Sequence, residues 1–447
     1  MLPQSFTERM QGLLESEYEE FLASFEHEKY QALRLNPLKK DDMSVITEKV
    51  KQTFQLQPVP WAENGYYYTK EDQPGKHPWH EAGLYYIQEP SAMAPVTLLS
   101  PRPGERILDL CAAPGGKSTQ IASAMEGEGL LVTNEIHPAR AKILSENVER
   151  MGIRNACVLN ETPEHLADIF EEYFDRILVD APCSGEGMFR RHPETRAEWS
   201  PESPAGCAKR QAEILDRAAE MLRPGGRIVY STCTMNRTEN EDTVDAFLSR
   251  HADFSLEAFS LPGADAPDGM LTCYPHRMKG EGHFVALLRK HGDAPCNWQK
   301  APEKDAPSKD ALQALRAFCP TANANVMRTG SGKPGRSRDE SVTLSCLPDR
   351  PVCDGIQVVR CGLQLGTVQK KLFVPDHAWA MSIFPPDVPR VELTREDARR
   401  YQAGETLPAD GKGWALACCD GIPLGWGKIS DGQMKNHYPK GLRRPLR

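Results

Sequence analysis

Short apolar runs alternate with longer segments of helical periodicity between residues 106 and 290. The runs RILDL, LLVTNE, ACVLN, RILVD, RIVYST and HFVALLRK are rich in aliphatic and β-branched residues. The segments between them, such as PARAKILSENVERM and AKRQAEILDRAAEML, place apolar residues every three or four positions. This alternation predicts an α/β domain with a doubly wound, mostly parallel sheet.

The flanking segments have different patterns. Residues 5–30 predict an amphipathic, acidic helix pair, and residues 57–90 are rich in Pro, His, Tyr and Gly, which is typical of an ordered loop and strand module. Residues 291–345 have the composition of a linker with weak structure, and a β-rich segment starts near residue 355. The predicted units are an N-terminal module (1–100), the α/β domain (101–291), a linker region (292–350) and a C-terminal β-rich module (351–447).

Composition narrows the class of protein. The chain has 447 residues, of which 40% are hydrophobic and 26% charged, as in ordinary globular proteins. Neither a signal peptide nor an apolar run of about 18 residues occurs, which predicts a cytoplasmic protein without a membrane span. The 13 cysteines include no CxxC pair, so neither a disulfide framework nor a bound metal is expected. The net charge of −8 argues weakly against a general nucleic-acid binder, although the last 16 residues hold five Lys or Arg and no acid.

A glycine turn follows the first strand of the α/β domain. In ILDLCAAPGGKS, Asp109 ends the strand, and Gly115 and Gly116 precede a helix, where backbone N–H groups favour an anionic or polar ligand. Glu135 ends the next strand, where an acid commonly accepts the ribose hydroxyls of a nucleoside. An empty turn is the alternative. NAD is the rival ligand, but the turn lacks the G-x-G-x-x-G spacing, so a nucleoside cofactor such as S-adenosylmethionine fits better.

Two cysteines follow the ends of two later strands. RILVD ends at Asp180 and leads into Cys183, and RIVYST leads into Cys233. Because ligands of such sheets lie beyond the carboxyl ends of the strands, these residues should face one crevice with the glycine turn. A thiolate that adds to carbon 6 of a pyrimidine, helped by an acid at the ring nitrogen, would activate carbon 5 toward a sulfonium methyl group. The alternative is that both cysteines are small packed hydrophobes.

At these residues the sequence resembles the Nop/Sun family of RNA cytosine-carbon-5 methyltransferases, which have a Rossmann-like core. The matching segments are QEPSAM, DLCAAPGGKSTQIA, VTNE, FDRILVDAPCSGEGMFRR, YSTCT and PHRMKGEGHF. The resemblance implies that Cys233 is the nucleophile, that Cys183 assists release of the methylated RNA, and that Asp180 contacts the target base. It also implies a set of positions that bind S-adenosylmethionine: Cys111, Ala112, Ala113, Pro114, Gly115, Gly116, Lys117, Glu135, Thr162 and Asp180.

Two of these cofactor positions have alternatives. Thr162 stands where many members have an Asp near the adenine, so Asn160, Glu161 or the backbone could hold the adenine instead. Lys117 could orient the methionine carboxylate of the cofactor or be a solvated surface lysine.

The C-terminal segment LGWGKISDGQMKNHYPKGLRR, with VVRCGLQLG upstream, resembles the extension of the RsmF-type bacterial enzymes, which is similar to PUA-like RNA-binding modules. Those enzymes act on small-subunit ribosomal RNA. The resemblance therefore implies a monomeric methyltransferase that acts on this RNA, free or within the 30S subunit. A tRNA methyltransferase of the same mechanism and a non-catalytic RNA-binding assembly factor are the alternatives.

Further residues are candidate RNA contacts. Arg190, Arg191 and His192 follow the predicted catalytic loop and could contact phosphates or merely be solvated. Tyrosines that could stack on bases or simply pack are Tyr66, Tyr67, Tyr68, Tyr85 and Tyr86. Basic residues of the C-terminal tail lie beside His437 and Tyr438, a mixture that suits single-stranded RNA: Lys435, Lys440, Arg443 and Arg444.

Overall fold

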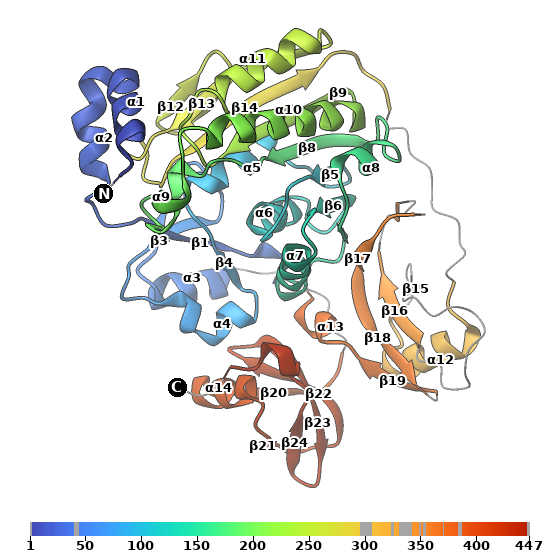
Figure 1. The fold of residues 1–447 in the computed structure, drawn as a ribbon. Helices are drawn as coiled ribbons and strands as arrows, with labels where there is room; N and C mark the ends of the chain where they lie inside the picture. The colour runs from blue at the N-terminus through green and yellow to red at the C-terminus, as the bar shows by residue number, and fades with distance from the viewer. Residues whose placement is uncertain are drawn as a thin grey trace.

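Five parallel strands form the centre of the largest sheet of the computed structural model, in the order β9-β8-β5-β6-β7 (Figure 1). Antiparallel strands extend it, with β14 beside β9, β10 and β13 beside β14, and β17 beside β7. The strands are β5 (Arg106–Asp109), β6 (Leu130–Asn134), β7 (Ala156–Leu159), β8 (Phe174–Asp180), β9 (Leu222–Thr232), β10 (Phe254–Leu256), β13 (Met270–Cys273), β14 (His283–Lys290) and β17 (Val358–Cys361). The mostly parallel sheet predicted from the sequence is confirmed.

The structure describes most of the chain: residues 2–39, 44–295, 306–322, 326–329, 342–347, 350–351, 355–369, 371–382 and 387–444. Within these ranges, no helix combines the length and the apolarity that crossing a bilayer requires.

Helices cover both faces of this sheet because successive strand side chains point to opposite sides. Ile107 and Leu131 pack on one face against helices α5, α6 and α7, whereas Leu108 and Val132 pack on the other against α8, α10 and α11. The helices are α5 (Ala94–Leu99), α6 (Gly116–Ala124), α7 (Pro138–Arg150), α8 (Pro163–Ala167), α10 (Ser203–Met221) and α11 (Glu241–Arg250). The two layers hold the strand ends rigidly, and the loops that follow the strands carry the candidate site.

The N-terminal module contains the predicted helix pair, α1 (Gln4–Leu14) and α2 (Tyr18–Ser24), followed by a four-stranded antiparallel sheet. The strand order is β2-β3-β1-β4, so the predicted loop and strand module at 57–90 forms one sheet with β1. Its other elements are β1 (Gln31–Leu35), α3 (Ser44–Thr53), β2 (Gln57–Pro58), β3 (Gly65–Tyr68), α4 (Pro78–Glu81) and β4 (Tyr85–Ile87).

The C-terminal part differs from the prediction of a weakly structured linker and one β-rich module. The predicted linker contains helix α12 and strands β15 and β16, and these strands form a sheet in the order β15-β16-β18-β19. A separate five-stranded sheet has the order β20-β22-β23-β24-β21. The elements are α12 (Lys309–Phe318), β15 (Val326–Thr329), β16 (Val342–Cys346), β18 (Leu363–Gln369), β19 (Leu372–Pro375), α13 (His377–Met381), β20 (Arg390–Leu393), α14 (Arg395–Ala403), β21 (Leu407–Pro408), β22 (Gly413–Cys419), β23 (Ile422–Ser430) and β24 (Gln433–Asn436). The composition predicted a weakly structured linker because the helix and both strands are short and lie among Pro- and charge-rich residues.

The two ends of the chain share one hydrophobic core. Leu33 and Trp79 of the N-terminal module belong to the same buried cluster as Tyr401 and Leu424 of the five-stranded sheet. Figure 1 shows this sheet, in red, beside α4 of the N-terminal module, in blue. An ion pair between Arg444 and Glu81, 2.6 Å long, crosses the same boundary.

Candidate active site

The two cysteines predicted to share a crevice lie next to each other. Strands β8 and β9 are parallel neighbours with Asp180 opposite Ser231, so the loops that follow them leave the sheet at the same edge. The sulfur atoms of Cys183 and Cys233 are 3.2 Å apart, and both side chains are half-buried. The sulfur of Cys233 and burial together raise the pKa of the Cys183 thiol.

A cavity of about 710 Å³ lies at this edge of the sheet. It brings together six residues predicted from the sequence: Cys111, Ala113, Glu135, Asp180, Cys183 and Cys233. The apolar part of its wall includes Leu110, Ile136, Pro163 and Ile214. The cavity therefore combines an apolar wall with acids and thiols, which is typical of a small-molecule site.

The glycine turn connects β5 to α6 behind this cavity. Gly115 has a φ of 113° and packs against Leu144, so a side chain there would be strained by the backbone conformation. A Cβ at Gly116 would lie 3.2 Å from the ring of Tyr86. Five predicted cofactor residues are not among the residues that line the cavity and belong to the turn behind its wall: Ala112, Pro114, Gly115, Gly116 and Lys117.

Asp109, at the end of β5, stabilises the same turn through a hydrogen bond. Its Oδ2 accepts a hydrogen bond from the hydroxyl of Ser118 at 2.6 Å, and burial raises the pKa of the Asp109 carboxyl to about 7. The sequence pattern placed Asp109 at this strand end, and the structure shows that it is fully buried and acts on the turn rather than facing the cavity.

The carboxylate of Asp180 has three polar partners. Lys117 Nζ donates to Oδ2 at 2.8 Å, the Ser231 hydroxyl donates to Oδ1 at 2.8 Å, and His283 Nε2 lies 3.6 Å from Oδ1. Burial alone would raise the pKa of Asp180, but Lys117 and His283 lower it below its ordinary value. Asp180 is therefore a carboxylate at neutral pH, and Lys117 is not a solvated surface lysine, since its side chain is only 10% exposed.

Glu135 follows β6 at the cavity wall and is 3% exposed. Its Oε1 accepts from the backbone N–H of His137 at 2.9 Å, and Oε2 lies 3.3 Å from Arg140. Thr162 does not line the cavity; its hydroxyl accepts from His165 N–H and caps α8, whereas the adjacent Pro163 and Glu164 do line the cavity.

A buried glutamate fixes the loop that carries Cys183. Glu239 Oε2 accepts from the backbone N–H of Ser184 at 2.8 Å and from Gln211 Nε2 at 3.1 Å. On the other side, the N–H of Gly187 donates to the carbonyl of Cys233 at 2.8 Å. The two cysteine loops are thus tied to each other, to helix α10 and to the segment that precedes α11.

The sequence did not point to His283, Ser231 or Glu239 as site residues. His283 begins β14, and its strand neighbour Phe284 pairs with Thr232, which places His283 beside the start of the Cys233 loop. The signal available in the sequence was the strand HFVALLRK directly after the GEG of the matched segment, but nothing in the pattern gives its antiparallel pairing with β9.

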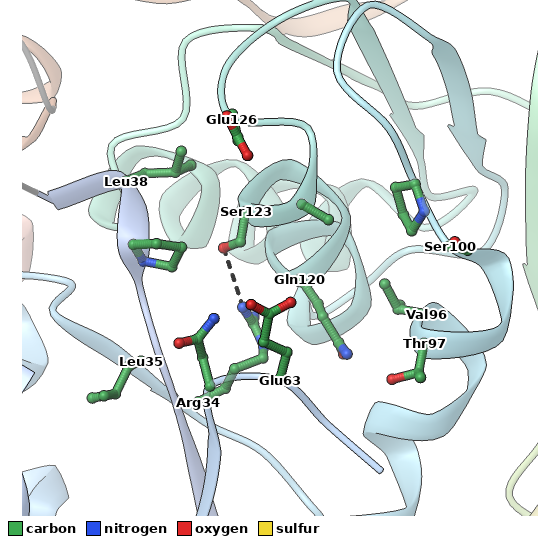
Figure 2. Close-up of a pocket in the computed structure, with 14 residues that line it drawn as sticks. Arg34, Leu35, Leu38, Glu63, Val96, Thr97, Ser100, Gln120, Ser123 and Glu126 are labelled. Carbon is green, nitrogen blue, oxygen red and sulfur yellow. Dashed lines mark hydrogen bonds between the residues drawn. The ribbon is translucent and has the colours of Figure 1, made fainter. Parts of the chain in front are cut away.

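A buried arginine joins the N-terminal module to the glycine turn. Figure 2 shows Arg34 and Ser123 at a second cavity, of about 580 Å³, on the side of α6. The Arg34 guanidinium donates to Gly116 O at 3.2 Å, to Thr119 Oγ1 at 2.7 Å and to Ser123 Oγ at 3.3 Å. Burial lowers the pKa of Arg34 to about 9, and among the described residues no carboxylate forms an ion pair with it.

The predicted RNA contacts divide into buried and accessible residues. The prediction that Arg190 contacts a phosphate is wrong, because its side chain is 4% exposed and pairs with Glu281 at 2.7 Å. Tyr85 and Tyr438 are buried and pack, so neither offers a face to a base. The exposed Arg444 pairs with Glu81, which ties the basic tail to the N-terminal module.

Four family models match successive parts of the chain. The N-terminal domain of 16S rRNA methyltransferase RsmF matches residues 2–90, and 16S rRNA methyltransferase RsmB/F matches residues 96–289. The RsmF rRNA methyltransferase first C-terminal domain matches residues 318–383, and the methyltransferase RsmF PUA domain matches residues 388–444. The match at 318–383 covers part of the predicted linker, in agreement with the sheet found there.

Curated relatives match over the whole chain. Ribosomal RNA small subunit methyltransferase F of Klebsiella pneumoniae (strain 342) is 34% identical over 99% of this chain and 96% of its own length. The protein of the same name from Aeromonas hydrophila is 33% identical over 99% and 98%.

Solved structures share the fold of about two-thirds of the chain. A methyltransferase homolog protein from Pyrococcus horikoshii, 28% identical, superposes with a TM-score of 0.57 over 64% of this chain and 95% of that one. NSun6 from Pyrococcus horikoshii, 22% identical, has a TM-score of 0.58 over 65% and 99% and shows the fold alone. From the full-length relatives and the four domain matches together, the chain belongs to the family of ribosomal RNA small subunit methyltransferase F.

Proposed function

We propose that this protein transfers a methyl group from S-adenosylmethionine to carbon 5 of cytosine in small-subunit ribosomal RNA, through a covalent bond between Cys233 and the base. The observation that carries the proposal is the pair of thiols, Cys183 and Cys233, 3.2 Å apart in the cavity that also contains Asp180. A nitrogen or oxygen acceptor attacks a sulfonium methyl group directly and needs no thiolate. A pyrimidine carbon 5 needs one, because it becomes nucleophilic only after addition at carbon 6.

The cavity fits the cofactor. Its volume of about 710 Å³ suits a nucleoside-sized ligand, and Glu135 offers a carboxylate at the strand end where ribose hydroxyls are commonly bound. Leu110, Ile136 and Pro163 offer an apolar surface for a purine. S-adenosylmethionine bound there would supply the electrophilic methyl group.

Lys117 and Asp180 have different roles at the target base: Lys117 is the donor and Asp180 the acceptor. Because Asp180 is ionised, it accepts an N–H from the base rather than supplying a proton. The ammonium of Lys117, held by Asp180 at 2.8 Å, is the group that can donate to the ring as Cys233 adds to carbon 6. The sequence-based hypothesis places an acid at the ring nitrogen. In the proposed mechanism that acid is the Lys117 ammonium, and Asp180 holds the ammonium in place.

The neighbouring sulfur of Cys233 and burial raise the pKa of the Cys183 thiol, so Cys183 retains its proton at neutral pH. After carbon 5 has received the methyl group, water removes the carbon-5 proton, the Cys233 sulfur leaves carbon 6 with the bonding electron pair, and the ring nitrogen returns its proton to Lys117. The Cys183 thiol, 3.2 Å from that sulfur, is placed to promote this release.

The modules outside the core support an RNA substrate. The segment of the PUA match at 388–444 shares one hydrophobic core with the N-terminal module, so the two modules pack against each other. A ribosomal RNA substrate would place the enzyme in the cytoplasm, and we expect the target cytosine to be splayed out of its stack to reach Cys233.

The test uses full-length protein, methyl-labelled S-adenosylmethionine and purified 16S ribosomal RNA. The parent protein should transfer label, Cys233→Ala should transfer none, and Cys183→Ala should accumulate a protein–RNA adduct that survives a denaturing gel. Cys207→Ala, a cysteine on α10 outside the cavity wall, is the matched control and should behave like the parent.

The outcomes separate the alternatives. Label in tRNA and none in ribosomal RNA would identify a tRNA methyltransferase of the same mechanism. Tight RNA binding without any transfer at saturating RNA would identify an assembly factor and overturn the proposal. An adduct that forms with Cys233 absent would overturn the assigned roles of the two cysteines.

A further inference from the structure

A strand from the C-terminal part of the chain completes the edge of the catalytic sheet. Strand β17 pairs antiparallel with β7, with Val358 opposite Leu159 and Cys361 opposite Cys157. Arg360 fixes the strand to α7, because its Nε donates to the Ser145 hydroxyl at 3.0 Å and its guanidinium pairs with Glu149. The strand therefore lies at the edge where the β6 and β7 loops leave the sheet.

The residue before β17 holds the loop that follows β7. The carbonyl of Gln357 accepts from the backbone N–H of Asn160 at 3.0 Å, and the N–H of Gln357 donates to Glu161 Oε1 at 2.7 Å. Glu161 Oε2 lies 2.9 Å from the imidazole Nδ1 of His165. Both oxygens of the Glu161 carboxylate are thus engaged, one of them by the backbone of the C-terminal part.

The same loop holds the wall of the cavity. Asn160 Nδ2 donates to the carbonyls of Glu135 at 2.7 Å and Ile136 at 2.9 Å. Asn134 Oδ1 accepts from the N–H of Glu161 at 3.0 Å, and Asn134 Nδ2 donates to the Glu161 carbonyl at 3.0 Å. Since Asn134, Glu135 and Ile136 line the cavity, only the 160–161 loop separates Gln357 from the cavity wall.

We propose that the backbone of Gln357 is a positioning element of the cofactor site: it holds Asn160 and Glu161, and through them the wall that carries Glu135. This inference rests on the proposed function, since it takes the cavity as the site of S-adenosylmethionine. The competing view is that β17 only attaches the C-terminal part and covers a sheet edge, a role that would leave cofactor affinity unchanged.

The experiment measures S-adenosylmethionine binding to the full chain by titration calorimetry in two matched pairs of variants. Gln357→Pro removes the N–H donor and keeps the carbonyl, whereas Gln357→Ala keeps both backbone groups. Glu161→Ala removes the acceptor, whereas Glu161→Gln keeps an oxygen in its place. We expect the Kd to rise about fivefold to tenfold in Gln357→Pro and in Glu161→Ala, and to stay within about twofold of the parent in Gln357→Ala and Glu161→Gln.

Two further readouts distinguish positioning from loss of the fold. Glu161→Ala should remain folded at the temperature of the titration and keep its RNA affinity, and the Glu161 pair carries the test alone if Gln357→Pro does not fold. Equal Kd values across Glu161→Ala, Glu161→Gln and the parent would overturn the inference while leaving the proposed function intact. A parent protein that binds no S-adenosylmethionine would instead refute the proposed function and this inference with it.

Discussion

The Nζ of Lys117 lies 2.8 Å from Oδ2 of Asp180, and this pair connects two segments that are 63 residues apart in the chain. Lys117 lies in the first turn of α6, directly after the glycine turn, and Asp180 is the last residue of β8. The contact joins the proposed cofactor turn to the end of the strand that leads to Cys183. It also keeps Asp180 ionised, so the two residues act as one unit with a donor and an acceptor.

Lys117→Met should lower the single-turnover methylation rate by about 10²-fold to 10³-fold, because it removes a preorganised cation from a partly buried site. Burial would then raise the pKa of Asp180, since Lys117 no longer opposes it. The active carboxylate form exists above this pKa, so the variant should lose activity at a higher pH than the parent as the solution is acidified. Lys142→Met, at an exposed lysine of α7, is the control. A pH–rate profile of the same shape for Lys117→Met and the parent would contradict the claim that Lys117 keeps Asp180 ionised.

Arg190→Ala should destabilise the protein rather than weaken RNA binding. Its guanidinium pairs with Glu281, and both side chains are almost fully buried, so the substitution leaves an unpaired buried carboxylate. Such losses cost about 3–5 kcal/mol. Chemical denaturation measures the free energy of unfolding, and RNA affinity is measured below the transition. Arg191→Ala is the matched control and should leave the free energy of unfolding unchanged; a stable Arg190→Ala protein with weakened RNA binding would restore the sequence-based assignment.

The parts of the fold that the sequence predicts are those that depend on local pattern. The alternation of β-branched runs and helical periodicity is a short-range signal, and it located the strands of the core sheet and the ends where Asp180, Cys183 and Cys233 lie. The glycine turn was equally visible, since Gly115 adopts a positive φ that few other residues tolerate.

What the sequence did not predict depends on contacts between distant segments. The partner of Arg190 is 91 residues away, and a charged residue in a predicted loop is usually solvated, so its burial left no local signal. The shared core of Trp79 and Tyr401 and the pairing of β17 with β7 are of the same kind. Glu239 was missed because it lies past Cys233, in a segment whose acidic composition predicts only the start of a helix.

Arg34→Met should weaken cofactor binding although Arg34 lies outside the cavity of the two cysteines. The guanidinium holds Gly116 O and Thr119 Oγ1, so its loss frees the first turn of α6, which carries Lys117. We expect an increase in the Kd for S-adenosylmethionine of about fivefold or more, since at least one hydrogen bond to a charged group is lost. Calorimetry on the full chain checks this. Arg102→Met, at a solvent-exposed arginine before β5, should bind like the parent, and equal affinity in Arg34→Met would show that β1 does not support the turn.

His377 makes stability depend on pH at the boundary between α13 and the five-stranded sheet. Burial lowers the pKa of its imidazole to about 4, from an ordinary value of 6.5. Its ring packs edge-on against Tyr438, and the charges that act on it are those of Glu149, Lys39, Arg360 and Glu81. Between pH 6.5 and pH 4 the unfolded chain therefore binds more protons at this residue than the folded chain does, and the folded state loses stability as the pH falls.

His377→Gln removes this titration and keeps a polar side chain of similar size. The Tm of the parent should fall more between pH 7.5 and pH 5 than the Tm of the variant, although other histidines with lowered pKa values, such as His77, leave part of the slope in both proteins. Differential scanning calorimetry at the two pH values measures the difference. His291→Gln, at an exposed histidine after β14, should keep the slope of the parent. A slope for His377→Gln as steep as that of the parent would mean that the imidazole is hydrated in the folded state and does not contribute to the acid sensitivity of this boundary.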